Sequence, residues 1–171
     1  MQTFLIYPYY TRQNQRTFAI VNQNQQIKYW VTRYQTSGNC RINDDQAQTI
    51  ASIYATDHYL WPNFKIQTQQ QTVRGYNLSP SNQPFYLIWR FGWWIRLKPQ
   101  TQTYHFYRGF QLIASAQPNA KGILQVTIHQ SAPLPTIFML IIFLDHVQKI
   151  EILSPDRKWQ PQIQTTTTPH P

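Results

Sequence analysis

The sequence predicts a mainly β protein: a closed antiparallel β-barrel of about 12 strands that encloses one C-terminal hydrophobic α-helix, residues ~136–151. Aromatic residues, which suit half-buried pleated surfaces, make up 15% of the 171 residues. Short apolar-rich runs recur about every 8–12 residues between turn signals, which is typical of an all-β barrel or sandwich. The segment from Ile137 to Leu144 is apolar on every side, which indicates a core element that the strands surround.

The strand-like runs follow one another from the first residues onward. They are expected at residues 4–7, 17–21, 27–31, 40–42, 49–54, 60–66, 72–75, 85–89, 93–97, 104–107, 110–114 and 123–128. The second and third runs flank a polar Asn/Gln turn and predict a hairpin. Asp44 and Asp45 lie in an expected polar turn, and Pro62 fits a strand start or an edge. Residues 77–84 form the clearest interior loop.

The apolar segment of residues 137–144 has neither strand nor helix periodicity, so a buried central strand is the alternative to a helix. Leu144, Val147 and Ile150 fall at helical spacing. This spacing predicts a helix whose first half is engulfed and whose second half emerges with a wet face. Pro135 suits the first turn of such a helix.

The predicted helix also explains how so wide a barrel is filled. A barrel of about a dozen strands encloses more space than strand side chains fill, so it needs ligand, water or another element inside. A two-sheet sandwich with the helix packed on one face is the structural alternative. One domain is expected over residues 1–153, followed by a polar Pro/Thr/Gln-rich tail over residues 154–171 that cannot bury enough surface to order itself.

Charge favours anionic partners. The chain carries 15 Lys and Arg against 6 Asp and Glu, a formal net charge of +9, which suits nucleic acid or the cytoplasmic face of a membrane. The basic residues are scattered, so only folding can gather them, and net charge also serves solubility.

The single cysteine, Cys40, excludes an intramolecular disulfide framework and fits a reducing compartment. With no leader-like N-terminus and no apolar run of membrane-spanning length, a cytoplasmic location and no transmembrane span are expected.

Motifs for chemistry are sparse. The five histidines lack the spacing of metal ligands, and no phosphate-binding or nucleophile-elbow motif occurs. We therefore expect no catalytic residue, no metal and no cofactor. Asp145 is interpreted as a solvated or barrel-rim residue, and Cys40 as buried and inert because strand alternation separates it from Arg41.

The best binding candidate is the aromatic and basic stretch from Trp89 to Lys98. Trp can sit at the lipid headgroup level or stack on bases, while Arg and Lys meet phosphates. The predicted binding residues for an anionic surface are Arg90, Trp94, Arg96 and Lys98. A structural interpretation stands beside this one: Phe91, Trp93 and Ile95 face the barrel core, while Arg90, Gly92, Trp94 and Arg96 face outward.

An ordered series of short motifs runs through residues 1–150. They are Phe18-Ala19-Ile20-Val21-Asn22-Gln23-Asn24 before Ile27, Ile50-Ala51-Ser52-Ile53, Pro62-x-Phe64-x-Ile66, Gly92-Trp93-Trp94-Ile95, Gln111-Leu112-Ile113-Ala114 and Leu140-Ile141-Ile142-Phe143-Leu144-Asp145. The series resembles the tubby C-terminal-like superfamily, within it the small bacterial and LURP-one-related members that share a fold with phospholipid scramblases. The first motif is similar to the F-x-I-x-D-x-x-G hairpin, with amides in place of its acidic and glycine positions.

The resemblance implies about twelve antiparallel strands around a central helix. Tubby domains are associated with phosphoinositide binding and scramblases with lipid movement, but no site residue carries over. The expected function is that of a non-enzymatic barrel domain that binds anionic phospholipid headgroups peripherally at the cytoplasmic membrane surface. The alternatives are a protein–protein interaction module, which predicts an exposed apolar patch, and a nucleic-acid-binding module. An enzyme or ligand carrier predicts a pocket with converging polar groups, which a helix-filled barrel is expected to lack.

Overall fold

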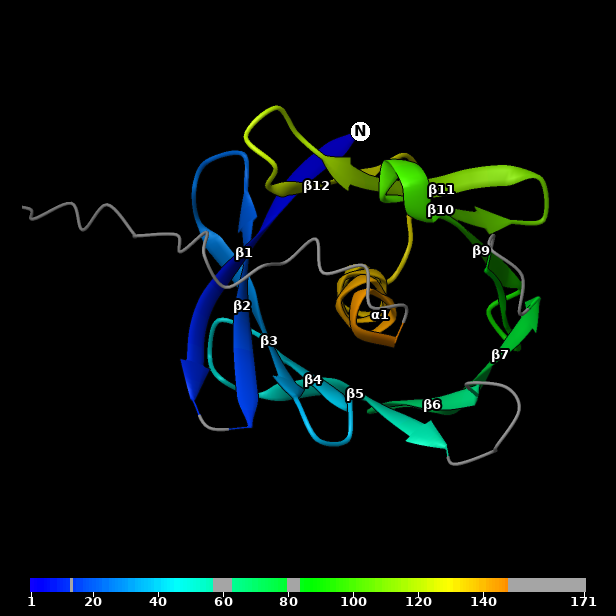
Figure 1. The fold of residues 1–171 in the computed structure, drawn as a ribbon, viewed down its shortest axis with the longest axis horizontal. Coiled ribbons are helices and arrows are strands. Elements are labelled where there is room, and N and C mark those ends of the chain that lie inside the picture. Colours follow the sequence, from blue (N-terminus) through cyan, green and yellow to red (C-terminus); the bar gives the residue numbers. More distant parts are fainter. Residues whose placement is uncertain (13, 57–62, 80–83, 148–171) are drawn as a thin grey trace, which may run out of the picture.

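The computed structural model describes residues 1–12, 14–56, 63–79 and 84–147. Across these residues twelve antiparallel strands close into a barrel around one α-helix (Figure 1). The elements are β1 (Gln2–Arg12), β2 (Gln15–Asn22), β3 (Ile27–Tyr34), β4 (Cys40–Asn43), β5 (Thr49–Thr56), β6 (Asn63–Thr68), β7 (Thr72–Ser79), β8 (Phe85–Ile88), β9 (Trp93–Lys98), the 3-10 turn η1 (Pro99–Thr101), β10 (Thr103–Arg108), β11 (Gln111–Pro118), β12 (Leu124–Ile128) and α1 (Leu134–Val147). The predicted barrel is confirmed, and the sandwich alternative is wrong.

Each strand pairs with its neighbours in sequence, and the first and last strands close the sheet. The closing pair runs from Gln2 opposite Ile128 to Ile6 opposite Leu124. Closure gives each of the twelve described strands a partner on both sides, which protects the sheet from pairing with another chain. Every predicted strand overlaps an observed one; the part of the sixth that covers residues 60–62 lies outside the described residues.

The two ends of the barrel are different. We call the end at which α1 begins the entry end; the turns after β2, β4, β6, β8 and β10 lie there, because strand direction alternates. We call the end at which the described part of α1 finishes, at Val147, the exit end; the turns after β1, β3, β9 and β11 lie there. Figure 1 looks along the barrel, with α1 in its centre.

The helix fills the barrel. Every residue from Thr136 to Asp145 is buried, and aromatic side chains connect α1 to opposite walls. Phe138 packs 5.0 Å from Phe4, ring centroid to centroid, and Phe143 packs 4.9 Å from Phe64. Since a buried aliphatic or aromatic side chain contributes about 1.5–3 kcal/mol, this helix is a large share of the core.

The helix departs from its predicted form in two respects. It begins at Leu134, two residues early, because the Pro133 carbonyl already accepts the N–H of Ile137 at 3.4 Å. The described helix emerges later than predicted: burial continues through Asp145, and His146 and Val147 are partly exposed. Residues 148–151 of the predicted helix and the predicted tail, residues 154–171, lie outside the described residues.

Gly75 on β7 provides a test of the packing between wall and helix. It lies opposite Phe64, and a Cβ at this position would overlap the Phe64 ring. That ring is held between Phe143 and Tyr86. We expect Gly75→Ala to lower the free energy of unfolding by about 1–3 kcal/mol through overpacking, measured by urea denaturation.

Adding Phe64→Leu to Gly75→Ala should recover part of this loss, because the smaller side chain vacates the space that the new methyl group needs. Thr72→Ala, an exposed change on the same strand, is the control and should shift stability by less than about 0.5 kcal/mol. If Gly75→Ala lowered the free energy of unfolding by no more than the Thr72→Ala control does, the wall would be shown to accommodate the added methyl group without strain.

Candidate functional site

The four predicted binding residues follow one strand and do not form a compact site. Arg90 lies in the turn between β8 and β9 at the entry end, with a positive φ of 63°. Trp94 and Arg96 lie on the outer face of β9, and Lys98 ends that strand toward the exit end. Arg90 precedes the first residue of β9 and Lys98 is its last residue, so Arg90 and Lys98 lie near opposite ends of the barrel.

The structural interpretation of this stretch is confirmed. Trp93 and Ile95 are fully buried, and Phe91 packs against the core. Arg96 and Lys98 are exposed. The period of two therefore places apolar side chains against α1 and basic side chains outside.

Trp94 is committed to the wall of the barrel. Its ring stacks on Tyr107 of β10, with centroids 3.9 Å apart and planes 9° from parallel. Its indole N–H donates a hydrogen bond to the Gly109 carbonyl at 2.6 Å. Because one face of its ring stacks on Tyr107 and its N–H group is already hydrogen-bonded, Trp94 is poorly placed to stack on a ligand. It stabilises the turn at Gly109 instead.

Basic groups gather on the outer face beside Arg96. His105 lies directly opposite it on β10. The pKa of His105 is lowered by burial first, and then by the charges of Lys98, Arg96 and His129. His129 lies 3.0 Å from the Ser115 hydroxyl, nitrogen to oxygen. The exposed charges of Arg96 and Lys98 make this part of the outer face basic.

More than half of the wall carries no acid. Residues 58–144 contain seven Lys and Arg and no Asp or Glu, and they supply strands β6 to β12. The acids of the described residues are Asp44, Asp45 and Asp145. Asp44 serves the turn after β4, as predicted, where its carboxylate accepts the backbone N–H groups of Gln46 and Gln48 at 3.0 and 2.8 Å.

Two large aromatic side chains project from neighbouring turns at the entry end. Trp89, after β8, is 64% exposed, and Phe110, after β10, is 102% exposed. Exposed arginines flank both, Arg90 next to Trp89 and Arg108 two residues before Phe110. β9 and β10 are paired, with Arg108 opposite Trp93, so the two turns are adjacent. We call Trp89, Arg90, Arg108 and Phe110 the aromatic tip.

Sequence reasoning missed half of the aromatic tip. The sequence predicts Phe110 as the first residue of a strand over residues 110–114, although the chain turns at Gly109–Phe110 before β11 begins at Gln111. The signal was Gly109, which has a φ of 56° and where an added Cβ would meet no atom within 4 Å. A glycine in that conformation marks the turn itself, so the residue after it belongs to the turn.

A buried ion pair joins the helix to the wall at the exit end. Arg33 Nη1 on β3 lies 3.8 Å from Asp145 Oδ2 on α1, and the two side chains are 5% and 2% exposed. The same nitrogen donates to the Ile142 carbonyl at 3.4 Å. The interpretation of Asp145 as a solvated residue is therefore wrong, because an inward-facing arginine meets it inside the barrel; the alternative, a residue at the barrel rim, agrees with its place at the exit end.

Two neighbouring aromatic side chains, Tyr104 and Phe18, interact with the charges of this ion pair. The pKa of Tyr104 is raised well above its ordinary value, first by burial and then by the negative charge of Asp145. The guanidinium of Arg33 also lies 5.3 Å from the centroid of the Phe18 ring, close enough for a cation–π contact. Strand alternation offered a signal for Arg33, because it shares the inward face of β3 with buried Val31.

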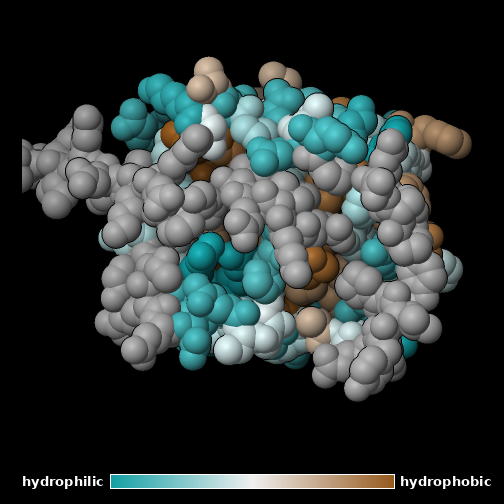
Figure 2. Space-filling model, in the orientation of Figure 1, coloured by the Kyte–Doolittle hydropathy of each residue, from teal (hydrophilic) through white to brown (hydrophobic). Residues whose placement is uncertain are grey.

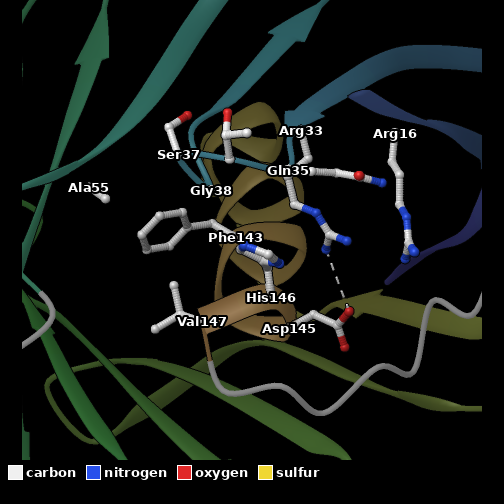
Figure 3. A pocket seen from close by; sticks show the side chains of 11 residues that line it. Arg16, Arg33, Gln35, Ser37, Gly38, Ala55, Phe143, Asp145, His146 and Val147 are labelled. Carbon is white, nitrogen blue, oxygen red and sulfur yellow. Dashed lines mark ion pairs between the residues drawn. The ribbon is translucent and has the colours of Figure 1, made fainter. Parts of the chain in front are cut away.

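A cavity of about 580 Å³ opens beside this ion pair. Among its lining residues are Arg16, Arg33, Ser37, Asp145 and His146 (Figure 3). Figure 2 shows hydrophilic side chains gathered on this face beside the hydrophobic centre. The expectation that a helix-filled barrel lacks a pocket with converging polar groups is wrong at this end, because α1 fills the middle of the barrel and leaves the rim hollow.

Within the described ranges, no group of three or more His, Cys, Asp and Glu residues lies so as to hold a metal ion. In the same part of the chain, no helix has both the length and the apolar character needed to cross a bilayer. Cys40 is buried, 1% exposed, with its neighbour Arg41 on the outer face. The prediction of a buried cysteine is confirmed.

Comparisons with known proteins identify no relative of this chain. No protein-family model, curated protein or solved structure matches the chain. The features that bear on function are the aromatic tip, the acid-free wall and the exit-end cavity.

The ion pair predicts a distinctive mutational pattern. Asp145→Leu and Arg33→Met should each lower the free energy of unfolding by about 3–5 kcal/mol, because each leaves the opposite charge buried without this partner. The double variant should lose far less than the sum, since both charges are gone. Urea denaturation of the four proteins measures the coupling; additive losses would show that the two groups do not interact.

Cys40 predicts a reactivity test and a pH dependence. Burial raises the pKa of its thiol from 9.0 to about 12, against a smaller lowering by Arg33. The native thiol should therefore react with a disulfide reagent only after unfolding. Because the folded-state pKa is raised, its contribution to stability is complete below pH 9.0 and is lost as the pH rises toward about 12.

Denaturation of the wild type and of Cys40→Ala between pH 8 and pH 11 would separate this contribution from that of the tyrosines. The variant should lose stability less steeply with pH. Rapid modification of the native thiol at pH 8, or parallel stability profiles, would contradict the burial argument.

Proposed function

We propose that this protein is a non-enzymatic tubby-like barrel domain that binds anionic phospholipid headgroups peripherally, at the cytoplasmic membrane surface, through the aromatic tip. The observation that carries the proposal is the exposure of Trp89 and Phe110 on adjacent turns, each beside an exposed arginine. The twelve-stranded barrel around an apolar helix agrees with the fold that the resemblance to the tubby C-terminal-like superfamily implies, and so supports the proposal.

The physical case rests on pairing two kinds of side chain at one end. Trp favours the headgroup region of a bilayer, and Phe gains from burial in the acyl boundary. Each Lys or Arg near an anionic surface contributes about 1 kcal/mol. The aromatic tip supplies Trp89 and Phe110 for insertion and Arg90 and Arg108 for headgroup phosphates.

The remaining predicted residues act at longer range. Arg96 and Lys98 lie on the outer wall, away from the tip, and strengthen the positive field of the acid-free wall without touching the membrane that the tip contacts. Such a field raises the rate of encounter with an anionic surface and weakens with salt. Trp94 contributes by fixing the Gly109 turn, through its hydrogen bond.

Vesicle co-sedimentation tests the proposal. The full chain should bind phosphatidylserine-containing vesicles, bind pure phosphatidylcholine vesicles weakly, and lose affinity at high salt. Phe110→Ala combined with Trp89→Ala should weaken binding about tenfold or more, since each buried aromatic contributes more than about 1.4 kcal/mol. Arg90→Glu with Arg108→Glu should abolish the preference for anionic vesicles, whereas Arg96→Glu should have a smaller effect.

Matched controls lie elsewhere on the wall. Tyr54→Ala removes an aromatic side chain that is 39% exposed on β5, and Arg41→Glu reverses an exposed charge on β4; neither should change binding beyond the effect of net charge. Equal loss from Tyr54→Ala and the tip variants would sink the proposal. Absence of vesicle binding would leave a protein partner for the aromatic tip, and preference for single-stranded RNA or DNA over vesicles would favour a nucleic-acid module.

A further inference from the structure

The exit-end cavity holds two arginines directly opposite each other. Arg16 on β2 is the register partner of Arg33 on β3, and both lie on the strand faces that carry buried Phe18 and Val31. Like charges directly opposite on neighbouring strands repel each other and destabilise the sheet. Such a pair persists at low cost where negative charge lies between the two groups.

One carboxylate serves this pair. Asp145 is the single acid among the described residues that line the cavity, and its ion pair is with Arg33 at 3.8 Å. Arg16 is half-buried, and its Nε atom is buried with no hydrogen-bond partner in the described part of the chain. With two guanidinium groups and one carboxylate, the lining carries a net charge of +1 when His146 is neutral.

His146 shares this environment with the two arginines. It lines the same cavity, with its ring against the backbone of Gly38, where an added Cβ would lie 3.0 Å from His146 Cδ2. Its pKa is lowered by burial first, then by the charges of Arg33 and Arg16. Figure 3 shows both arginines extending from the wall toward the side on which Asp145 lies.

We propose that this cavity binds a small organic oxyanion, a phosphate or a carboxylate, clamped between the guanidinium groups of Arg16 and Arg33. A guanidinium presents its donors in a planar fork that matches the oxygens of either group. The volume of about 580 Å³ falls within the range of about 300–1,000 Å³ of small-molecule sites and leaves room beyond the anionic group. Ser37, Gln35 and His146 line that space.

The site takes a solute and not a lipid headgroup, because the cavity and the aromatic tip lie at opposite ends of the barrel. A membrane bound at the entry end would leave the exit end facing water. The oxyanion site itself is independent of the proposed membrane binding, because the cavity, the arginine pair and the unpartnered Nε of Arg16 exist whether or not the tip contacts lipid; its assignment to a solute rests on that proposed function.

Heteronuclear NMR of the full chain tests the site, with inorganic phosphate and succinate as probes and sodium chloride at matched ionic strength as the reference. Saturable shifts are expected for Arg16, Arg33 and Ser37 with either oxyanion and not with chloride. The pKa of His146 should rise on binding, since the ligand offsets the positive potential. Arg16→Gln should weaken binding about tenfold, while Arg41→Gln, an equal charge change on the outer face of β4, should leave it unchanged.

Thr36→Glu provides a second variant that keeps the folded core intact, because Thr36 is an exposed loop residue lining the cavity. Its new negative charge should also weaken binding about tenfold. Equal shifts with chloride, or unchanged affinity in both Arg16→Gln and Thr36→Glu, would overturn the site. Binding to phosphatidylserine vesicles that Arg16→Gln weakens more than Arg41→Gln does would overturn the assignment to a solute, whereas equal vesicle binding by the two variants would support it.

Discussion

The fold depends on a mutual requirement between α1 and the barrel. A helix that is buried from Thr136 to Asp145 on every side can exist in water only when it is enclosed, and a barrel of twelve strands can close only when something fills it. Each element therefore stabilises the other. Closure also removes the exposed edges at which such a Tyr-, Thr- and Gln-rich sheet would pair with other chains.

A buried ion pair between the helix and the wall fixes the position of α1 along the barrel axis. Hydrophobic burial is non-directional, so by itself it discriminates weakly between different depths of an apolar helix inside the barrel. The approach of Arg33 to Asp145, at 3.8 Å between nitrogen and oxygen, ties one position on α1 to one position on β3. Buried polar pairs are best attested in this role of fixing register, and here the same pair also lines the exit-end cavity.

The two ends of the barrel thereby acquire different chemistry. At the entry end, short turns carry Trp89 and Phe110 into solvent beside arginines. At the exit end, inward-facing Arg16 and Arg33 converge on the end of the helix. The wall between them is positive over strands β6 to β12, because residues 58–144 contain no acid. A protein built this way can meet a surface at one end and a solute at the other, and its charge favours anions at both.

The sequence by itself determined the class of fold and most of its elements. Alternation in residues 93–97 is a local property of a half-buried strand, and an apolar run such as residues 137–144 needs enclosure wherever it lies. The same alternation sorted Trp93 and Ile95 from Arg96 and Lys98 correctly. Tertiary structure decided what no local pattern contains: that Asp145 is buried because Arg33 reaches it, that Arg16 and Arg33 are opposite each other, and that Trp89 and Phe110 share one end. These outcomes depend on strand register and on the depth of the helix, which pair residues as much as 112 positions apart in the chain.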